Sequence, residues 1–377
     1  MPKESLAGER RVALSPDAVS QLVKSNISVQ VEHDAGLGAG FTDTAYTTAG
    51  AKIVGDARAA TADADLVLRV SPPTVGEVGA LKRGSSHISF LFPTSNADVV
   101  AALTEAGINA FAMELMPRIT RAQSMDALSA MSSIAGYKAA LLAAEALPKF
   151  FPMLMTAAGT IPAAKVFVIG AGVAGLQAIA TCKRLGAQVE AFDVRPAAKE
   201  QVESCGGRFV GMSLLAEEAE DSGGYAKEVS ADTHAKELDL IASRLPKTDV
   251  VITTALIPGK KAPILITRDM LAKMQTGSVV VDLAAPAGGN CEATIPGQNV
   301  VENGVTVLGP LNLLSSMAGD ASRMYSKNIT EFLKLLMPNA AIEINMEDEI
   351  IKATLVTSDG KIPHEPTRLS LEHGSGA

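Results

Sequence analysis

The stretch of sequence that decides the fold is Lys165-Val166-Phe167-Val168-Ile169-Gly170-Ala171-Gly172-Val173-Ala174-Gly175-Leu176. A β-branched apolar run is followed at once by a G-x-G-x-x-G motif and a helix-forming sequence, which is typical of a dinucleotide-binding strand–turn–helix unit. Gly170 permits the tight turn, Gly172 lets the backbone approach a pyrophosphate, and Gly175 lets the helix pack closely on the strand. The start of the helix, at Val173 and Ala174, offers free N–H groups and a partial positive charge to the phosphates.

An acidic residue stands at the end of the next predicted strand, 188–193, as this motif requires. Asp193 follows Gly175 by 18 residues. A carboxylate at this position accepts hydrogen bonds from the adenosine ribose hydroxyls and repels a 2′-phosphate, so the motif favours NAD(H) over NADP(H). Arg195 weakens that preference only slightly, and Val194 and Arg195 are expected to belong to the same cofactor site.

Further strands are predicted at 249–254, 278–283 and 305–308, consistent with a six-stranded doubly wound sheet. Ligands of open α/β sheets lie outside the carboxyl ends of the strands, so Thr254, Ala255 and Leu256 are expected to line the cofactor cleft. Asp282 ends another of these strands. It is interpreted equally well as a helix cap or as a buried acid with satisfied hydrogen bonds.

The first third of the chain predicts a second α/β domain. Its β-rich runs alternate with helical stretches, which implies parallel βαβ units. The runs are 27–31, 66–70, 87–92 and 109–113.

Two predicted crossings make this domain discontinuous. An Ala-rich helix, 123–147, leaves the domain, and the chain returns to it near Met317. A hairpin between 351–356 and 361–362 is expected close to the end. The fold class is therefore α/β, with two doubly wound Rossmann-like domains around a cleft. The first domain comprises 1–127 plus 318–377, and the NAD(H)-binding domain comprises 128–317.

A polar cluster is predicted at the junction of the two domains. Gln123, Asp126 and Ser129 recur every three residues and share one face if the segment is helical, and Arg118 shortly precedes them. An amide, a carboxylate, a hydroxyl and a guanidinium suit a carboxamide ligand such as nicotinamide, which has one acceptor and two donors. The alternative is an N-terminal capping cluster with Asp126 paired to an arginine.

A second glycine-bearing loop, 221–227, contains Gly223-Gly224-Tyr225. Two glycines beside an amphipathic aromatic side chain are typical of a hinged lid that closes over a nucleotide. An ordinary surface loop explains this composition equally well.

Composition excludes several classes of function. The formal net charge of −8 disfavours nucleic acid as a partner, because phosphate binding needs a basic face. The three cysteines are far apart and form no C-x-x-C pair, and the histidines, His33 and His234 among them, are scattered, so no metal site is expected. No signal peptide or membrane span is predicted.

The chain resembles the NAD(H)-binding alpha subunit of the proton-translocating NAD(P) transhydrogenase family over nearly its whole length. The motifs that carry the resemblance are Arg118–Ser129, Gly170–Leu176, Gly223–Lys227, Thr253–Gly259 and Gly288–Cys291. The opening residues Pro2-Lys3-Glu4 and Arg11–Pro16 fit the wider family that includes alanine dehydrogenase. Because the chain stops before any membrane helix, it resembles the split type, whose membrane parts are separate polypeptides.

The resemblance implies an oxidoreductase of the Si-specific, Re-side, proton-translocating type. A soluble component, often called domain I, binds NAD(H), forms a homodimer and docks on a separate NADP(H)-binding beta subunit. Hydride passes directly between the two nicotinamides, and a membrane-spanning subunit couples this transfer to proton movement. The protein is then cytoplasmic and peripheral on the inner membrane.

The resemblance also assigns roles to particular residues. The residues on the nicotinamide side map onto Arg118, Gln123, Asp126 and Ser129. The mobile lid maps onto 223–227 with Tyr225 at its tip, and the ribose acid maps onto Asp193.

Two alternatives remain open from the sequence. An alanine dehydrogenase-like enzyme, acting on an amino acid with NAD, needs a Lys and a His for acid–base chemistry. Ser71 and Phe90 occupy the two aligned positions, and the nearest histidine is His87. Transfer between two nicotinamides needs no such pair, because it depends mostly on positioning. A non-catalytic NAD sensor would show the same binding motifs.

Overall fold

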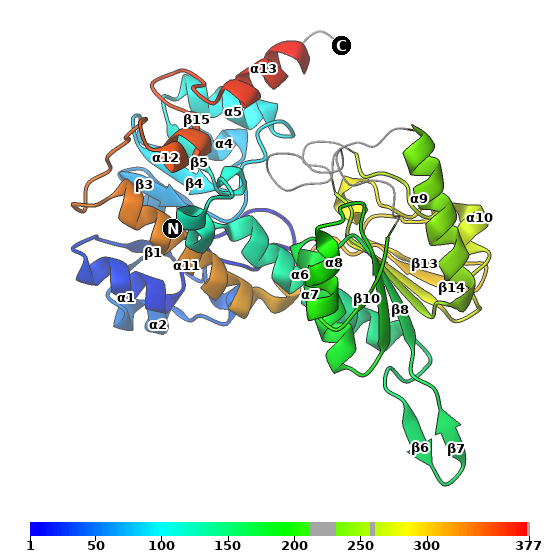
Figure 1. Ribbon diagram of the computed structural model, residues 1–377. Helices are drawn as coiled ribbons and strands as arrows, with labels where there is room; N and C mark the ends of the chain where they lie inside the picture. Colours follow the sequence, from blue (N-terminus) through cyan, green and yellow to red (C-terminus); the bar gives the residue numbers. More distant parts are fainter. Residues whose placement is uncertain (212–230, 257–260, 375–377) are drawn as a thin grey trace. The chain divides into compact units, whose positions relative to one another are not determined.

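The chain divides into two compact units, shown in Figure 1 as a computed structural model that describes residues 1–211, 231–256 and 261–374. Unit 1 is discontinuous and comprises Met1–Met131 and Leu314–Ala377, and unit 2 comprises Ser132–Leu313. The boundaries expected from the sequence were 127/128 and 317/318. The predicted α/β class, with Rossmann-like parallel sheets, is confirmed.

Unit 2 contains a doubly wound sheet. Among its described residues the strand order is β10-β9-β8-β11-β12-β14-β13, in which every neighbouring pair is parallel except β13 and β14. The order of the parallel strands is that of a dinucleotide-binding fold, with the first strand, β8, in the middle. The strands are β8 (Lys165–Ile169), β9 (Gln188–Phe192), β10 (Arg208–Val210), β11 (Val250–Thr253), β12 (Val279–Asp282), β13 (Asn299–Glu302) and β14 (Val305–Leu308).

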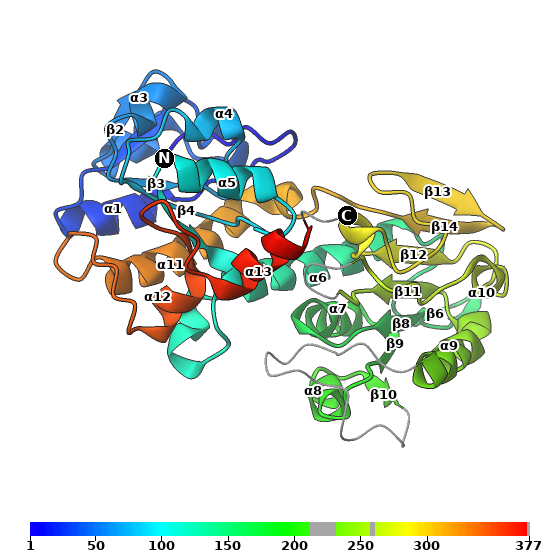
Figure 2. The ribbon, with the colours of Figure 1, turned by 90° about the horizontal axis from the view of Figure 1, so that it is seen from above.

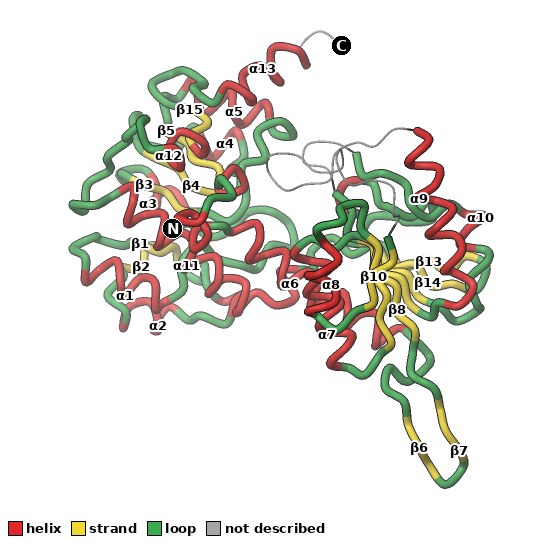
Figure 3. The backbone as a smooth tube through the Cα atoms, in the orientation of Figure 1, coloured by secondary structure: helices red, strands yellow, loops and turns green. Residues whose placement is uncertain are grey.

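Helices cover both faces of this sheet, which explains why its central strands are apolar at every position. Val166 and Val168 face one core with helices α6, α7 and α8, and Phe167 and Ile169 face the other core with α9 and α10. Figures 2 and 3 show these helices around the strands of unit 2. The helices are α6 (Ala127–Ala146), α7 (Val173–Arg184), α8 (Ala198–Ser204), α9 (Ala231–Arg244) and α10 (Arg268–Leu271).

A two-stranded antiparallel hairpin projects from unit 2 in Figure 1. It consists of β6 (Leu154–Thr156) and β7 (Gly159–Ile161). Its apolar side chains are exposed, with Met153 at 58% and Met155 at 79%.

Unit 1 contains a smaller sheet in the order β15-β5-β4-β3, in which only β15 is antiparallel to its neighbour among the described strands. A separate parallel pair is formed by β1 and β2. The strands are β1 (Gln30–Glu32), β2 (Lys52–Val54), β3 (Leu66–Leu68), β4 (Ser86–Ser89), β5 (Asn109–Ala112) and β15 (Leu355–Thr357). The helices are α1 (Pro16–Lys24), α2 (Asp43–Thr48), α3 (Ala57–Thr61), α4 (Val75–Val78), α5 (Ala97–Glu105), α11 (Ala318–Leu336), α12 (Glu349–Thr354) and α13 (Glu365–Gly374).

The hairpin expected near the end of the chain is wrong. Residues Glu349–Thr354 form helix α12, and the strand that follows, β15, pairs with β5. Asp348 caps the helix, since its Oδ1 accepts hydrogen bonds from the backbone N–H groups of Ile350 and Ile351 at 2.8 and 3.4 Å.

Within the described residues, one helix, α6, is long and apolar enough to cross a membrane by length and composition. Its apolar composition also has a packing reason in unit 2. Ala139, Ala140 and Ala143 belong to the core beside β8, and Gly136 lies against the first turn of α7.

Candidate functional site

The glycine loop after β8 has the shape that its sequence predicts. Gly170 adopts φ +96°, and a Cβ at Gly175 would lie 1.9 Å from the carbonyl oxygen of Gly170. A Cβ at Gly172 would meet no described atom within 4 Å. Gly172 precedes helix α7, whose first turn has no side-chain cap among the described residues. The loop is therefore closed toward the sheet and open toward a ligand, as a pyrophosphate at a helix N-terminus needs.

Asp193 lies directly after β9 and binds this loop. Its Oδ2 accepts the backbone N–H of Ala171 at 2.7 Å, and its Oδ1 accepts the backbone N–H of Arg195 at 2.8 Å. The guanidinium of Arg195 donates to both oxygens, at 2.9 Å from Nε and 3.0 Å from a terminal nitrogen. Each oxygen thus already accepts two hydrogen bonds, so ribose hydroxyls bind this carboxylate only if the Arg195 side chain moves.

The acidic character of this end of unit 2 is stronger than the motif alone indicates. Glu237 on α9 is buried, and its Oε2 lies 3.1 Å from Nδ1 of His234. Burial raises the pKa of Glu237, the hydrogen bond to His234 opposes the shift, and the nearby charge of Asp193 adds to it. Two carboxyl groups near one guanidinium disfavour a further phosphate.

Thr254, Ala255 and Leu256 follow the neighbouring strand β11. The Thr254 hydroxyl donates to the carbonyl oxygen of Gly170 at 3.0 Å, so it supports the glycine loop from behind. The Leu256 side chain is exposed. The backbone of Ala255 is held on both sides by Asn290, which accepts its N–H at 3.1 Å and donates to its carbonyl oxygen at 2.9 Å.

Asp282 is a fully buried acid with satisfied hydrogen bonds, which decides between the two interpretations of its sequence position. Its Oδ1 accepts from the Thr253 hydroxyl and its Oδ2 from the backbone N–H of Asn290 and the Thr294 hydroxyl, at 2.9, 2.7 and 2.6 Å. Gly288 and Gly289 adopt φ of +99° and +88° in the turn that brings Asn290 back to Asp282. The motif 288–291 therefore holds the loop after β11 in place.

Several predicted cofactor residues lie outside the described residues. These are the lid, with Gly224 and Tyr225, and residues 257–259 of the motif after β11.

The polar cluster 118–129 belongs to unit 1 and is not one continuous helix. Residues Thr120–Met125 form a 3-10 helix, Asp126 leaves it with ψ 86°, and α6 begins at Ala127. Asp126 accepts the backbone N–H of Ser129 at 2.8 Å and its hydroxyl at 2.6 Å. Asp126 therefore caps α6, as the capping alternative predicted, and the shared helical face is wrong.

The side chains of Arg118 and Gln123 are exposed, whereas those of Asp126 and Ser129 are half-buried. Arg118 and Gln123 thus lie where a ligand can reach them, with Asp126 and Ser129 fixing the backbone beside them. A different arginine, Arg121, holds the 3-10 helix to the cap of α12 through Asp348 at 2.8 Å.

The positions that would carry acid–base chemistry in an alanine dehydrogenase are also in unit 1. Ser71 is buried, and its N–H and hydroxyl donate to Glu4 and Glu9. Phe90 is buried and stacks on Tyr325 with ring centroids 5.2 Å apart. The nearby His87 is fully buried, and burial lowers its pKa to about 3, so it stays neutral.

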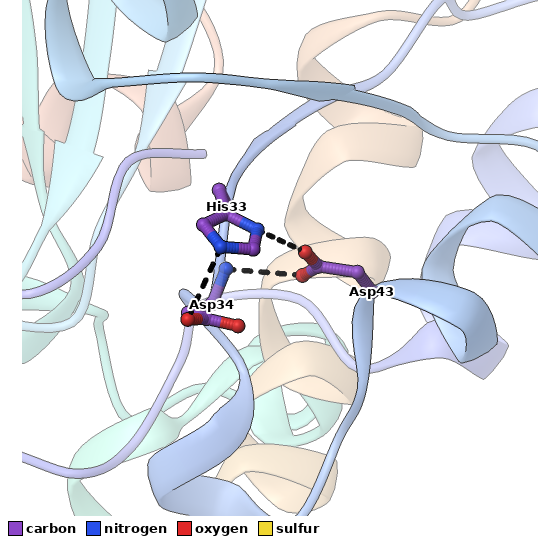
Figure 4. A group of neighbouring side chains, drawn as sticks. All are labelled: His33, Asp34 and Asp43. Atoms are coloured by element: carbon purple, nitrogen blue, oxygen red, sulfur yellow. Dashed lines mark hydrogen bonds and ion pairs between the residues drawn. The ribbon is translucent and has the colours of Figure 1, made fainter.

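One further polar group is notable because it contains His33, Asp34 and Asp43 on the surface of unit 1 (Figure 4). Nδ1 of His33 lies 2.5 Å from Asp43, and its Nε2 lies 3.3 Å from Asp34. Both ring nitrogens face carboxylate oxygens, and Asp43 also accepts the backbone N–H of Asp34 at 3.0 Å. The group joins the turn at 33–34 to the start of α2.

A cavity of about 850 Å³ lies elsewhere in unit 1, between the 358–363 turn and the 344–346 segment. It is lined by Lys361 and Arg368 and by apolar side chains such as Leu355. None of the predicted site residues lines it, so cavity size does not identify the cofactor site here.

Sequence reasoning missed three residues that shape the site in unit 2: Gly136, Glu237 and Asn290. A Cβ at Gly136 would lie 2.0 Å from the carbonyl oxygen of Ala174, so this glycine lets α6 reach the dinucleotide loop. The only sequence signal for Gly136 was its position as an isolated glycine in an Ala-rich helix.

Comparisons with known proteins agree over the whole chain. Residues 1–135 match the N-terminal domain of the alanine dehydrogenase/PNT family, and residues 139–365 match its C-terminal domain. The chain is 49% identical to the first of the separate polypeptides that make up the NAD(P) transhydrogenase alpha subunit of Rhodospirillum rubrum, over 97% of each. The crystal structure of transhydrogenase from Sinorhizobium meliloti is similar, with 46% identity, a TM-score of 0.87 and coverage of 96% of this chain and 98% of that one. Alanine dehydrogenase of Bacillus subtilis is more distant, at 30% identity over 98% of this chain and 94% of its own.

Proposed function

Because the chain belongs to the alanine dehydrogenase/PNT family, and within it is similar to transhydrogenase alpha subunits, we propose that it is the NAD(H)-binding component of a proton-translocating transhydrogenase. In this proposal the hydride passes directly, with Re/Si stereochemistry, between NADH on this chain and NADP⁺ on a partner subunit. The observation that carries the proposal is the loop at 170–175, closed toward the sheet and open at Gly172, with Asp193 beside it.

The residues of unit 2 hold the adenosine and pyrophosphate parts of the dinucleotide. Gly170, Gly172 and Gly175 with Val173 and Ala174 present the helix N-terminus to the phosphates. Thr254, Ala255 and Leu256 line the same end of the sheet. Gly224 and Tyr225 are proposed to cover the bound nucleotide.

Asp193 is proposed to bind the ribose, with Val194 and Arg195 beside it. The ribose hydroxyls then replace the two guanidinium hydrogen bonds that Arg195 now makes.

The residues of unit 1 are proposed to orient the nicotinamide. Arg118 and Gln123 are exposed polar groups with donors and an acceptor for the carboxamide, and Asp126 and Ser129 lock the backbone that carries them. NADH supplies the hydride, and no proton is exchanged with the chain in the transfer. Rate enhancement therefore comes from bringing donor and acceptor carbons to about 3–3.5 Å, which is a matter of orientation.

The proposed partners are a second copy of this chain, an NADP(H)-binding subunit and a membrane-spanning subunit that couples transfer to proton movement. Self-association is supported by the β6–β7 hairpin, where Met153, Met155 and Ile161 are exposed on strands that do not join the main sheet. The chain is proposed to act in the cytoplasm, held at the inner membrane through its partners.

An alanine dehydrogenase-like activity is less well supported. The chain is 30% identical to the Bacillus subtilis enzyme against 49% for the transhydrogenase subunit. Ser71 and Phe90 offer no proton acceptor at the two aligned positions, and His87 is buried and neutral.

The test is reconstitution of this chain with an NADP(H)-binding transhydrogenase component. The chain alone should bind NADH with almost no turnover, and the mixture should transfer hydride to an NADP⁺ analogue in stopped-flow absorbance. A mixture without transfer would point to an NAD sensor, and alanine-dependent reduction of NAD⁺ by the chain alone would support the alternative.

Cofactor selection should depend on Asp193. We expect Asp193→Asn to raise the Kd for NADH about tenfold or more, because hydrogen bonds to a charged acceptor contribute roughly 1.5–3 kcal/mol. The Kd for NADPH should change less or improve, since the carboxylate no longer repels a 2′-phosphate. Calorimetric titration with both nucleotides measures the ratio. Glu190→Gln, on the same strand β9, is the matched control, and an unchanged ratio in Asp193→Asn would remove Asp193 from the ribose site.

A further inference from the structure

The carboxyl ends of two neighbouring strands of unit 1 are joined by one side chain, Glu114. It lies just after β5, in the 3-10 turn Met113–Leu115. Its two oxygens accept the backbone N–H of Leu91 at 3.1 and 3.0 Å, and Oε1 also accepts the backbone N–H of Phe92. Leu91 and Phe92 follow β4, which pairs in parallel with β5. Glu114 therefore links the loop after β4 to the loop after β5.

The loop after β4 has a backbone conformation that needs such support. Phe92 has φ +45°, in the left-handed region that bulky side chains rarely adopt. Asn96 completes the turn, since its Nδ2 donates to the carbonyl oxygens of Leu91 and Phe92 at 2.8 and 3.2 Å. Conformations of this kind persist only where surrounding contacts fix them, and they cluster at ligand sites.

The side chain of Phe92 is 44% exposed, although it is a large aromatic group. It stacks on the buried ring of Phe90 with centroids 5.8 Å apart. It lies at the edge of the sheet where the parallel strands end, which is the edge at which ligands of open α/β sheets bind. Arg118 follows Glu114 by four residues at the same edge.

We propose that Glu114 is a positioning residue for hydride transfer, which fixes the 91–96 turn and the exposed ring of Phe92 to the segment that carries Arg118 and Gln123. The proposal rests on the proposed function, in which that segment orients the nicotinamide. Glu114 acts through backbone groups and touches neither nucleotide.

The carboxyl group also makes this link sensitive to pH. Withdrawal from water raises the pKa of Glu114 to about 7, and the N–H groups of Phe92 and Leu91 oppose the shift. When the turn opens, water solvates the carboxyl group and the pKa returns toward its ordinary value of 4.5. The closed turn is therefore favoured below pH 4.5 and loses that advantage as the pH rises to about 7.

The titratable groups around Glu114 are few among the described residues. Tyr325 on α11 interacts with it electrostatically, and its hydroxyl donates to the carbonyl oxygen of Arg69. Helix α12, which packs against the 3-10 turn, carries Glu349 and Lys352 and is capped by Asp348. Asp348 and Glu349 pair with Arg121. Helix α5, after the turn, begins with the exposed Asp98.

The experiment compares Glu114→Ala and Glu114→Gln with the wild-type chain, with Glu105→Ala at the exposed end of α5 as control. In Glu114→Ala, hydride transfer to the NADP⁺-loaded partner component should fall roughly tenfold or more while the Kd for NADH changes less than about threefold. Glu114→Gln keeps an acceptor oxygen for both N–H groups and should restore transfer. Equal transfer in Glu114→Ala and wild type would overturn the positioning role.

Amide hydrogen exchange at Leu91 and Phe92 tests the link without any activity. In the wild-type chain, protection corrected for intrinsic exchange should fall between pH 5 and 7 by up to about tenfold per pH unit. In Glu114→Gln it should be flat. A wild-type profile that matches the Gln variant would refute the link, even if transfer itself were absent and the proposed function had failed.

Discussion

Replacement of Gly175 by alanine is expected to destabilise unit 2 by about 3 kcal/mol or more and to abolish NADH binding. The added Cβ would lie 1.9 Å from the carbonyl oxygen and 2.9 Å from the carbonyl carbon of Gly170. Both are backbone atoms of the glycine loop, so relief requires α7 to move away from β8. Overpacking of a well-packed contact costs about 1–3 kcal/mol, and backbone clashes cost more.

Gly172→Ala is the matched control because it separates binding from folding. Gly172 has φ −74° and ψ −170°, which alanine adopts without strain, and its Cβ would meet no described atom within 4 Å. We expect the free energy of unfolding to change by less than about 0.5 kcal/mol. The Kd for NADH should still rise about 100-fold, because the methyl group stands where the pyrophosphate approaches the backbone. Urea denaturation and calorimetric titration measure the two effects.

The two glycines should therefore behave in opposite ways in the two assays. Normal NADH binding by Gly172→Ala would place the pyrophosphate away from this loop. A fully stable Gly175→Ala would show that the contact between α7 and β8 tolerates a shift that its geometry disfavours.

The unit 2 fold was predictable because its signals are local. Apolar β-branched runs such as 165–169 and 249–254 are buried on both faces, and this burial makes them continuous rather than alternating. The glycine pattern then identifies which strand comes first. The edge strand β13 (Asn299–Glu302) was missed because its alternating exposed and half-buried residues lack that signal.

The errors arose where a short segment is decided by tertiary partners. Ile350 and Ile351 are β-branched, which suggested a strand, but six residues are too few to show helical periodicity. The helix exists because Asp348 caps it and Arg121, more than 200 residues earlier, binds Asp348 at 2.8 Å. The break at Asp126 has the same cause, since its side chain binds Ser129 instead of continuing the helix.

The candidate site divides in the same way. The motif residues Gly172, Gly175 and Asp193 were predictable because their spacing expresses a geometric need. Glu114 and Asn290 were not, because a single acid or amide after a strand has no periodic signal. Their roles depend on backbone groups that only the folded chain brings to them.

Gln123→Ala is expected to slow hydride transfer about 100-fold while the Kd for NADH rises less than about threefold. Gln123 is exposed on the 3-10 helix Thr120–Met125, so its removal should not disturb the core of unit 1. Most of the binding free energy of the dinucleotide comes from the pyrophosphate and adenosine contacts in unit 2. The carboxamide contact instead fixes the ring orientation, and a misplacement of about 1 Å costs about 100-fold in rate.

Ser124→Ala is the control, because Ser124 lies on the same turn and its side chain is exposed, while its backbone carbonyl still accepts the hydrogen bond from Asn328. Stopped-flow transfer with an NADP⁺-loaded partner component gives the rate, and fluorescence titration gives the Kd. Parallel losses of rate and affinity in Gln123→Ala would mean that the residue binds ground state and transition state equally, and so does not orient the ring. A loss confined to the rate would distinguish a catalytic transhydrogenase component from an NAD sensor, because a sensor has no reason to control ring orientation.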